Sequence, residues 1–531
     1  MKFKNIIKSF VLFLLLLIGL TNCSGFLSEY SQDMVIAKHV EDFDELLLGA
    51  CYIPSVQQEY GETGTACGGF FNILDDDVNT GRGAGIVGQN TTSRAWLNSV
   101  SPTFGYFAWQ LEVGKNYSGT ITNGDNVTWD DLYKRINTIN VILDEIKDIP
   151  HTTTDEDAAW WRVQGEAHFL RGCFYFILAN LYGDAYSPAT ASSALSVPLK
   201  LTAYVEHDKN KPTQFERATA KDVYNQIIED LKTADEYLTK SPQIDTHRLY
   251  RASAEAAEVL LSRVYLYMQD WSNAELMADK ALKSKHNSLA GLSLLGKGVT
   301  FLTSDNPEII FSQGSNYLAP PEIFTGGAGD FCVASELYNL YDKENDKRWE
   351  TFFSVNSTTD SIALANKYEK GLLRARVSDA FSIRMAEAYL NKAEACAMQS
   401  GKEAEACQYL NQLRRQRIVG YEDKTYSGRQ LVDEIRLERR KELCFEGQRW
   451  FDLRRYAVNE SYPYKRQIVH VFNACGDEID FIASRTYILK ENDFAYTFAI
   501  PKTTMDFDKV PMKDNPREKR DYLKDNNNKE E

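Results

Sequence analysis

The residues of this sequence best suited to binding chemistry are aromatic side chains gathered between positions 96 and 129. Seven aromatic residues fall within these 34 positions, although aromatic residues make up only 12% of the chain. They are Trp96, Phe104, Tyr106, Phe107, Trp109, Tyr117 and Trp129. Aromatic rings stack against the C–H faces of sugars, while amides and guanidinium groups bind the hydroxyls. The nearby polar side chains of Asn79, Arg82, Gln89 and Asn98 complete this mixture, which predicts a carbohydrate-binding loop.

The candidate ligand-binding residues combine rings with amide and guanidinium groups. They are Asn79, Arg82, Trp96, Asn98, Tyr106, Trp109, Tyr117 and, from a second stretch, Tyr317. We expect Trp96, Tyr106 and Trp109 to form the main stacking platform. A buried ring platform is worth about 1 kcal/mol or more, whereas a hydroxyl hydrogen bond that competes with water nets about 0.5 to 1.5 kcal/mol. A site of this kind needs neither a metal nor a cofactor, and none is expected.

Not every ring in these stretches is expected to meet a ligand. Half or more of the rings between 96 and 129 are expected to pack beneath the loops, and Trp129 falls on a predicted helix. The second stretch contains Tyr317, Phe324 and Trp349. Because Trp349 stands beside Arg348 in a stretch that resembles a scaffold segment, it is expected to be buried.

Carboxylates are numerous, but nothing in the sequence marks a catalytic pair. Glycoside hydrolysis needs two carboxyl groups that flank a cleft. The glutamates that stand out fall close to basic residues and are interpreted as partners in helix-stabilising ion pairs. These pairs are Glu166 with Arg171, Glu387 with Arg384, and Glu438 and Glu442 with the basic residues at 439–441. We therefore expect no enzyme activity, and an exported glycoside hydrolase remains a less favoured alternative.

Metal and nucleotide motifs are weak. The sequence contains no Cys-x-x-Cys and no His-Glu-x-x-His, so a zinc site has no ligand set. The glycines at 83–88 match a dinucleotide fingerprint, but no strand is predicted before them. Asp75, Asp77 and Asn79 resemble the start of a calcium loop, yet Thr80 and Ile86 occupy positions that need Gly and Glu. A surface turn is favoured here, and a nonstandard calcium site stays open.

The N-terminus predicts export and lipidation. Three lysines precede an apolar run from Phe10 to Leu20, which is about half of the roughly 20 residues that a spanning helix needs. Leu20 to Cys23 resembles a bacterial lipobox, which implies that residues 1–22 are a signal peptide and that Cys23 carries lipid. Ser24 resembles the residue found in lipoproteins that continue to the outer membrane. The alternative is an ordinary secretory signal with an incidental cysteine.

Net charge bears on nucleic-acid binding, and the positions of the cysteines bear on disulfide formation. The net charge is −15, and residues 434–455 hold seven basic and five acidic side chains, so a nucleic-acid surface is not expected. Eight cysteines remain besides Cys23, and those that fall in helical patterns are expected to be buried thiols. Only Cys51 and Cys67, which lie in a Gly-rich stretch, leave a disulfide open.

Helical periodicity dominates from about residue 128 onward. A helix is expected to end at Gly183, and helical pairs are expected at 253–268 with 271–282 and at 386–397 with 404–413. A last helix from about 427 to 446 is expected to end at Gly447. These pairs resemble tetratricopeptide hairpins but are interrupted. We expect a mainly helical chain with a few short strands, organised as one domain over 23–531. Its scaffold spans about 128–300 and 376–455, and loop-rich insertions span about 60–127 and 300–375.

Several segments together resemble the SusD-like (RagB/SusD) family of outer-membrane nutrient-binding lipoproteins. The resemblance covers nearly the whole mature chain. The carrying segments are Cys23 to Leu27 with 41–43, Trp129 to Tyr133 with Asn137 and Asn140, Gly165 to Gly172 with Leu181 to Asp184, Arg384 to Ala395, Glu438 to Arg454, and Ile500-Pro501 at the place of the family's closing strand.

This resemblance implies a function. Family members share a helical scaffold with tetratricopeptide-like pairs, perform no catalysis, and cover a TonB-dependent (SusC-like) outer-membrane transporter. They bind ligands through loops in the two regions noted above, with ligand residues that vary. The resemblance therefore implies a lipid-anchored, surface-exposed protein of the outer membrane that binds an oligosaccharide or polysaccharide. A peptide-binding member of the same family is the alternative.

Overall fold

The structure is a computed structural model of the 531-residue chain. It describes residues 37–54, 67–81, 103–120, 125–204, 208–241, 249–285, 287–318, 324, 331–357, 360–370, 376–475 and 481–523, with no side-chain description for 474, 475 and 481–483. The predicted signal peptide, Cys23, Arg82, Gln89, Trp96 and Asn98 lie outside the described residues.

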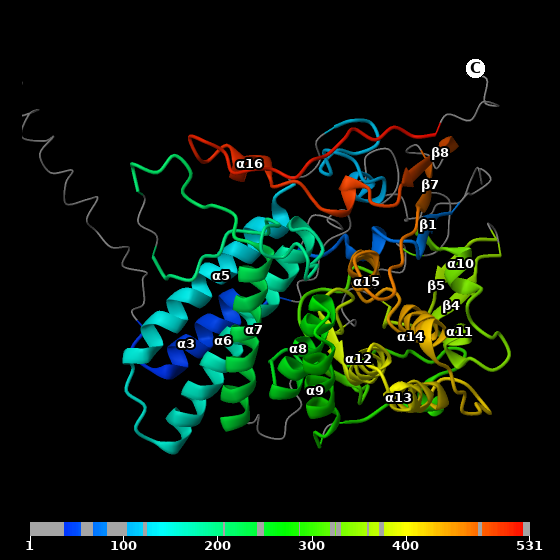
Figure 1. Ribbon diagram of the computed structural model, residues 1–531, viewed down its shortest axis with the longest axis horizontal. Coiled ribbons are helices and arrows are strands. Elements are labelled where there is room, and N and C mark those ends of the chain that lie inside the picture. The colour runs from blue at the N-terminus through cyan, green and yellow to red at the C-terminus, as the bar shows by residue number, and fades with distance from the viewer. Residues whose placement is uncertain are drawn as a thin grey trace, which may run out of the picture.

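Helices that follow one another along the chain pack side by side and build the scaffold (Figure 1). The longer helices are α3 (Val40–Leu46), α5 (Val127–Glu145), α6 (Thr154–Tyr182), α7 (Ala220–Lys240), α8 (Ala254–Met268), α9 (Trp271–Leu282), α12 (Met385–Ala397), α13 (Glu403–Arg415), α14 (Gly428–Glu442) and α15 (Arg449–Ala457). Short ones are α4 (Phe104–Phe107), α10 (Ser335–Tyr338), α11 (Lys347–Phe352) and α16 (Lys502–Met505). Contacts run from α6 to α7, α8, α9, α12 and α13 in turn, so the predicted mainly helical architecture is confirmed.

Local sequence signals explain where several helices begin and end. Thr153 and Glu156 form a capping box at the start of α6, and α6 ends at Gly183 as predicted. Ser253 caps α8 through a hydrogen bond from the amide of Ala256, and Asp270 caps α9 in the same way. The predicted helical pairs 253–268 with 271–282 and 386–397 with 404–413 are confirmed.

Two glycines let α6 and α7 approach closely. A Cβ atom on Gly165 would lie 2.8 Å from Cγ of Leu238, and one on Gly172 would lie 2.9 Å from Cγ of Leu231. Both distances are shorter than a carbon–carbon contact allows. The glycines of the segment 165–172 therefore serve the packing of these helices.

The predicted end of the helix before Gly447 is wrong by several residues. α14 ends at Glu442, and the chain then turns through left-handed backbone at Phe445 (φ 58°) and Gly447 (φ 69°). The ammonium group of Lys367 donates to the carbonyl oxygens of Glu442, at 3.0 Å, and Cys444. This distant lysine satisfies the helix end, which a local reading of the sequence could not anticipate.

Most of the short strands lie in the two predicted insertions. The structure has a four-stranded sheet in the order β1-β3-β5-β4 and the pairs β2–β6 and β7–β8. The strands are β1 (Val78–Thr80), β2 (Ile309–Ser312), β3 (Phe331–Val333), β4 (Phe353–Val355), β5 (Ile362–Leu364), β6 (Ser382–Arg384), β7 (Ile468–Cys475) and β8 (Phe481–Leu489). β1 pairs with β3 in antiparallel register, with Val78 opposite Val333, so the two insertions meet in one sheet. Ile500 and Pro501 are not in a strand, because Pro501 instead leads into α16.

Buried thiols and apolar side chains fill the interior. Cys51 and Cys67 are both buried and free, so the disulfide left open by the sequence is not formed. Trp129 is buried on α5 as expected, whereas Trp349 is only partly buried. In the described part of the chain, no helix has both the length and the apolar character needed to cross a membrane.

The glutamate Glu442 of α14 lies at the centre of a buried ion-pair network. Its carboxylate contacts Arg348 and Arg384 at 2.7 Å each and Arg417 at 2.8 Å. The side chains of all four residues are at most 2% exposed. Burial acts to raise the pKa of Glu442, but the three guanidinium groups hold that pKa well below its ordinary value.

The predicted local ion pairs are therefore mostly wrong. Lys441 does lie 3.6 Å from Glu438 on the same helix, but the shorter contact of Glu438 is with Arg414, at 2.7 Å. On α6, Glu166 and Arg171 are five residues apart, about 140° around the helix, and cannot meet.

Each of these side chains pairs instead with a residue distant in sequence. The pairs are Glu166 with Arg251 at 2.9 Å, Arg171 with Asp230 at 2.6 Å, Glu387 with Arg263 at 2.5 Å, and Arg384 with Glu308 and Glu446 at 2.8 and 2.7 Å in addition to Glu442. The conspicuous charged residues of the sequence therefore hold different segments together.

We predict that Glu442→Gln lowers the free energy of unfolding by about 3 to 5 kcal/mol, because it leaves three buried guanidinium groups short of negative charge. Asp433→Asn on the same helix is the matched control. Asp433 is about half exposed and pairs with Arg429, so its loss should cost less than about 1 kcal/mol. Urea unfolding of the parent and both variants measures the difference, and equal losses would contradict the central role of Glu442.

Candidate functional site

Three of the predicted ligand residues meet on one strand, β7. The side-chain oxygen of Asn79 accepts a hydrogen bond from the amide of Val471 at 2.8 Å. The ring of Trp109 stacks on His470, with centroids 4.2 Å apart, and Tyr117 lies 5.3 Å from Phe472. Figure 1 shows β1, β7 and β8 lying together at one end of the molecule.

The hairpin formed by β7 and β8 was missed by our reading of the sequence. A signal was present, because residues 468–472 and 487–489 are rich in β-branched and aromatic side chains. The hairpin supplies the surface against which the aromatic loop packs, so it belongs to the site.

Trp109 is buried, which runs against our expectation that its ring stands open to a ligand. The side chain is 4% exposed, and its indole N–H donates to the carbonyl oxygen of Leu74 at 2.9 Å. The residue has left-handed backbone (φ 48°), which turns the ring inward over His470. Trp109 reaches solvent only as one of the residues that line a cleft beside β8.

His470 is enclosed by the aromatic loop and by the acidic turn before β1. Its ring lies between those of Phe107 and Trp109, with centroid distances of 4.3 and 4.2 Å. Nδ1 lies 2.8 Å from the carbonyl oxygen of Phe107, and Nε2 lies 2.6 Å from that of Asp75. Burial lowers the pKa of His470 to about 4, so the imidazole is neutral near pH 7 and donates to one of the two carbonyl groups.

Tyr106 and Tyr317 are buried as well. The ring of Tyr106 stacks on Phe70 with centroids 4.1 Å apart and planes 10° apart. The Tyr317 hydroxyl donates to the carbonyl oxygen of Cys67 at 3.3 Å, and its amide donates to Asp379 at 3.0 Å. In this structure both tyrosines hold the base of the loops, and their rings are not presented to solvent.

Tyr117 is the predicted ring that keeps an open side. It is half-buried, and the guanidinium carbon of Arg485 lies 4.8 Å from the centre of its ring. Arg485 also lies 4.2 Å from the ring of Tyr522. This layer of two rings and one guanidinium group has the chemistry of a sugar-binding surface.

Two clefts lie on either side of the turn 490–494. The first, of about 400 Å³, is lined by Trp109, Arg517, Arg520 and Tyr522 together with that turn. The second, of about 450 Å³, lies between the turn, the end of α6 and α15, and Arg454 lines it. We call them the Trp109 cleft and the Arg454 cleft. Their volumes suit a sugar residue or a similar small group.

The aspartates 75 to 77 are buried rather than set in the surface turn that we predicted. Arginines from distant segments bind two of the three: Asp76 lies 2.8 Å from Arg449, and Asp77 lies 2.8 Å from Arg440. Burial acts to raise the pKa of Asp76, but Arg449 and Arg440 lower that pKa below its ordinary value. Guanidinium groups take the place that a cation would need, which argues against the calcium alternative.

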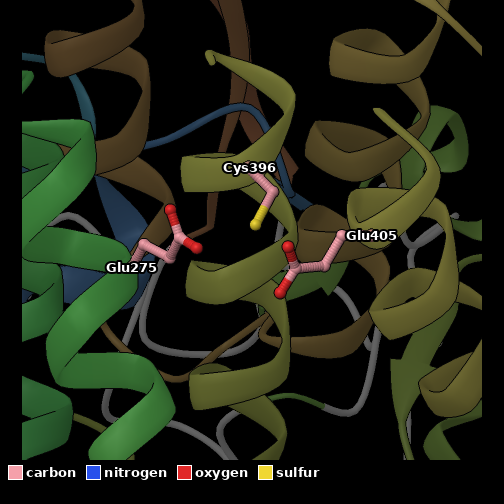
Figure 2. Close-up of side chains that lie close together, drawn as sticks. All are labelled: Glu275, Cys396 and Glu405. Carbon is pink, nitrogen blue, oxygen red and sulfur yellow. The ribbon is translucent and has the colours of Figure 1, made fainter. Parts of the chain in front are cut away.

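A second group with metal-ligand chemistry lies in the scaffold (Figure 2). Glu275 on α9, Cys396 on α12 and Glu405 on α13 offer ligand atoms within 4.8 Å of one another. The ammonium group of Lys392 lies 3.0 Å from Glu275 and 2.8 Å from Glu405. Burial raises the pKa of Cys396 to about 12, so the thiol stays protonated. This group is a lysine held by carboxylates that joins three helices.

Two family models and a curated relative match this chain. A family model described as "Starch-binding associating with outer membrane" matches residues 88–266, and the model of the SusD family matches residues 373–529. SusD-like protein P38 of Formosa agariphila is 24% identical over 402 residues, which cover 61% of this chain and 71% of the relative.

Solved structures show the same fold. A SusD superfamily protein from Bacteroides fragilis aligns with a TM-score of 0.62 and 23% identity, over 88% of this chain and 98% of the other. A SusD-like carbohydrate binding protein from Bacteroides vulgatus aligns with a TM-score of 0.62 and 20% identity, over 88% and 96% of the two chains.

We predict that Trp109→Ala lowers the free energy of unfolding by about 3 to 5 kcal/mol, because it empties a buried ring position and removes the hydrogen bond to Leu74. Tyr117→Ala should cost clearly less, because that side chain is only partly buried. Thermal and urea unfolding of both variants tests this order. A Trp109→Ala protein with the parent's melting temperature but weakened glycan binding would instead identify the ring as a ligand platform.

Proposed function

This chain belongs to the SusD-like (RagB/SusD) family, and from that premise we propose that it binds nutrient glycans at the cell surface and delivers them to a TonB-dependent, SusC-like transporter of the outer membrane. The observation that carries the proposal is the match of two family models, one in each half of the chain, to a chain with the helical scaffold of solved SusD superfamily structures. The ligand that we favour is an oligosaccharide or polysaccharide.

The described carboxylates support a binding role without catalysis. The first candidates for a catalytic carboxylate of a hydrolase are each buried and bound by arginine. They are Glu166, Glu387 and Glu442. A carboxylate held in this way is not available as a nucleophile or general acid in a substrate cleft. An exported glycoside hydrolase therefore stays the least favoured alternative.

The ligand-binding face that we propose is the loop-rich end that contains residues 79–117. Tyr117 and the Trp109 cleft are its described part, and Arg82, Trp96 and Asn98 belong to the same stretch of chain. Asn79, Tyr106, Trp109 and Tyr317 support this face from below by their contacts with the β7 strand and the loop base. We propose that the whole segment 23–531 acts as one domain with these loops as insertions.

Attachment to the membrane follows from the N-terminal sequence. We propose that residues 1–22 are removed as a signal peptide and that lipid on Cys23 holds the protein at the outer membrane. The family is associated with that membrane, which agrees with this proposal.

A peptide-binding role within the family is the second candidate. We predict that the purified mature chain binds members of a neutral and acidic glycan array and binds no member of a matched panel of peptides. Binding should depend weakly on salt, because rings and neutral hydrogen bonds do not depend on long-range charge. Selective binding of peptides would overturn the glycan assignment, and turnover of a bound glycan would restore the hydrolase.

We also predict that the lipoprotein, extracted from membranes in mild detergent, carries with it a large β-barrel transporter. Affinity purification followed by mass spectrometry identifies the partner. The same purification from cells that produce Cys23→Ala gives the matched control, since the unlipidated form should be recovered outside the membrane fraction. Recovery of the lipoprotein alone across several mild detergents would contradict the partnership.

A further inference from the structure

The Arg454 cleft lies on the other side of the turn 490–494 from the Trp109 cleft. α15 and the residues after it form one wall, residues 184–190 after α6 form another, and residues 491–497 close it. None of its residues was among the predicted ligand contacts.

Arg454 is a buried lining residue of this cleft, and no carboxylate of the described residues forms an ion pair with it. The side chain is 4% exposed, and Nη2 donates to the carbonyl oxygen of Gly183 at 2.6 Å and to the hydroxyl of Thr497 at 3.1 Å. Its Nη1 is buried and has no hydrogen-bond partner among the residues that the structure describes. A buried donor without an acceptor costs free energy, which a ligand oxygen would recover.

Two other arginines of α15 differ from Arg454, because each forms an ion pair with a carboxylate. Arg455, the next residue, lies 2.6 Å from Glu394 and 2.7 Å from Asp452. Arg449, five residues earlier at the start of α15, lies 2.8 Å from Asp76. Both are paired with carboxylates, whereas Arg454, which lines the cleft, has a buried N–H group with no partner among the described residues.

The Thr497 hydroxyl links Arg454 to the carboxylate of Asp184. The Thr497 hydroxyl lies 3.1 Å from Oδ1 of Asp184, and Asp184 is exposed at the rim of the cleft. A sugar hydroxyl can accept a hydrogen bond from one group and donate one to another. Arg454 and Asp184 therefore offer the two halves of a hydroxyl site.

The charges around the cleft balance. Arg466 is bound by Glu336 at 2.8 Å, and Asp493 is bound by Arg520 at 2.5 Å. Lys465 and Glu491 are exposed and opposite in sign, and Arg454 and Asp184 add one charge of each sign. A neutral ligand suits this environment better than an anion does.

Aromatic and aliphatic side chains supply the apolar surface. Phe494 is 52% exposed, a high value for a phenylalanine, and it lines both the Arg454 cleft and the Trp109 cleft. Tyr496 lines the wall and stacks on Trp450, with centroids 4.9 Å apart and planes 25° apart. Leu453 extends this wall from α15. An exposed ring above paired hydrogen-bonding groups matches the two faces of a sugar.

We propose that the Arg454 cleft binds one unit of a neutral sugar, which stacks on Phe494 and places a hydroxyl between Arg454 and Asp184. This site is distinct from the predicted loop 79–117, and the inference rests on the proposed glycan-binding function. Its position beside the Trp109 cleft allows one oligosaccharide to contact both sides of the turn 490–494.

The test uses isothermal titration of the whole mature chain with maltohexaose, xylohexaose and laminarihexaose, and with a hexamer of galacturonic acid. Phe494→Ala and Asp184→Asn change exposed groups of the cleft, so both variants should fold. Phe507→Ala is the matched control, because Phe507 is 65% exposed and lines neither cleft. Circular dichroism establishes that every variant is folded.

We expect the parent to bind at least one of the three neutral hexasaccharides. Phe494→Ala and Asp184→Asn should each raise the Kd about tenfold, while Phe507→Ala leaves it unchanged. If the parent binds and both cleft variants bind like Phe507→Ala, the cleft proposal is overturned and the glycan-binding function stands. Binding of the galacturonic acid hexamer alone overturns the neutral assignment. A parent that binds none of the four probes overturns both proposals.

Discussion

The packing of this structure depends on the compensation of buried charges, because removing a charge from water costs free energy. Glu442 is completely buried, and a carboxylate in that position is tolerated only if cations and hydrogen bonds replace its hydration. Three arginines provide this replacement, and each comes from a different part of the chain. Arg348 lies in the second insertion, Arg384 lies at the start of α12, and Arg417 follows α13. A single buried charge therefore fixes the insertion, two scaffold helices and α14 relative to one another.

The same constraint attaches the first insertion. Asp76 and Asp77 in the turn before β1 are buried, and arginines of α14 and α15 bind them. β1 then pairs with β3 and contacts β7, so the acidic turn, the sheet and the hairpin form one support. The aromatic loop 103–120 packs on this support through His470, whose neutral ring fits between two aromatic rings. The loop base is thus held in place by ion pairs at one end and by ring stacking at the other.

Buried scaffold side chains and exposed loop side chains are under different physical constraints. Identity with the relatives and solved structures reported above is only 20 to 24%, yet the fold is shared over most of the chain. Buried ion pairs and helix crossings tolerate little change, because losing one partner leaves the other charge uncompensated. Side chains at the rim of a loop or cleft, such as Tyr117 and Phe494, carry no such constraint. Ligand preference can therefore vary among proteins with one scaffold.

The sequence by itself determined the elements whose signals are local. The period of apolar residues located the helical pairs, and Gly183 located the end of α6, because both signals act within a few residues of the backbone that they shape. It also determined the family, through an ordered set of segments. Of the local ion pairs that it predicted, only the long contact of Glu438 with Lys441 is seen among the described residues, and the four glutamates singled out bind mainly arginines far away in sequence. Only the tertiary structure decided that Trp109 is buried on His470 and that Arg454, which lines a cleft, has a buried N–H group with no partner among the described residues. The burial and partners of a side chain depend on which distant segments fold against it, and the sequence near that side chain does not contain this information.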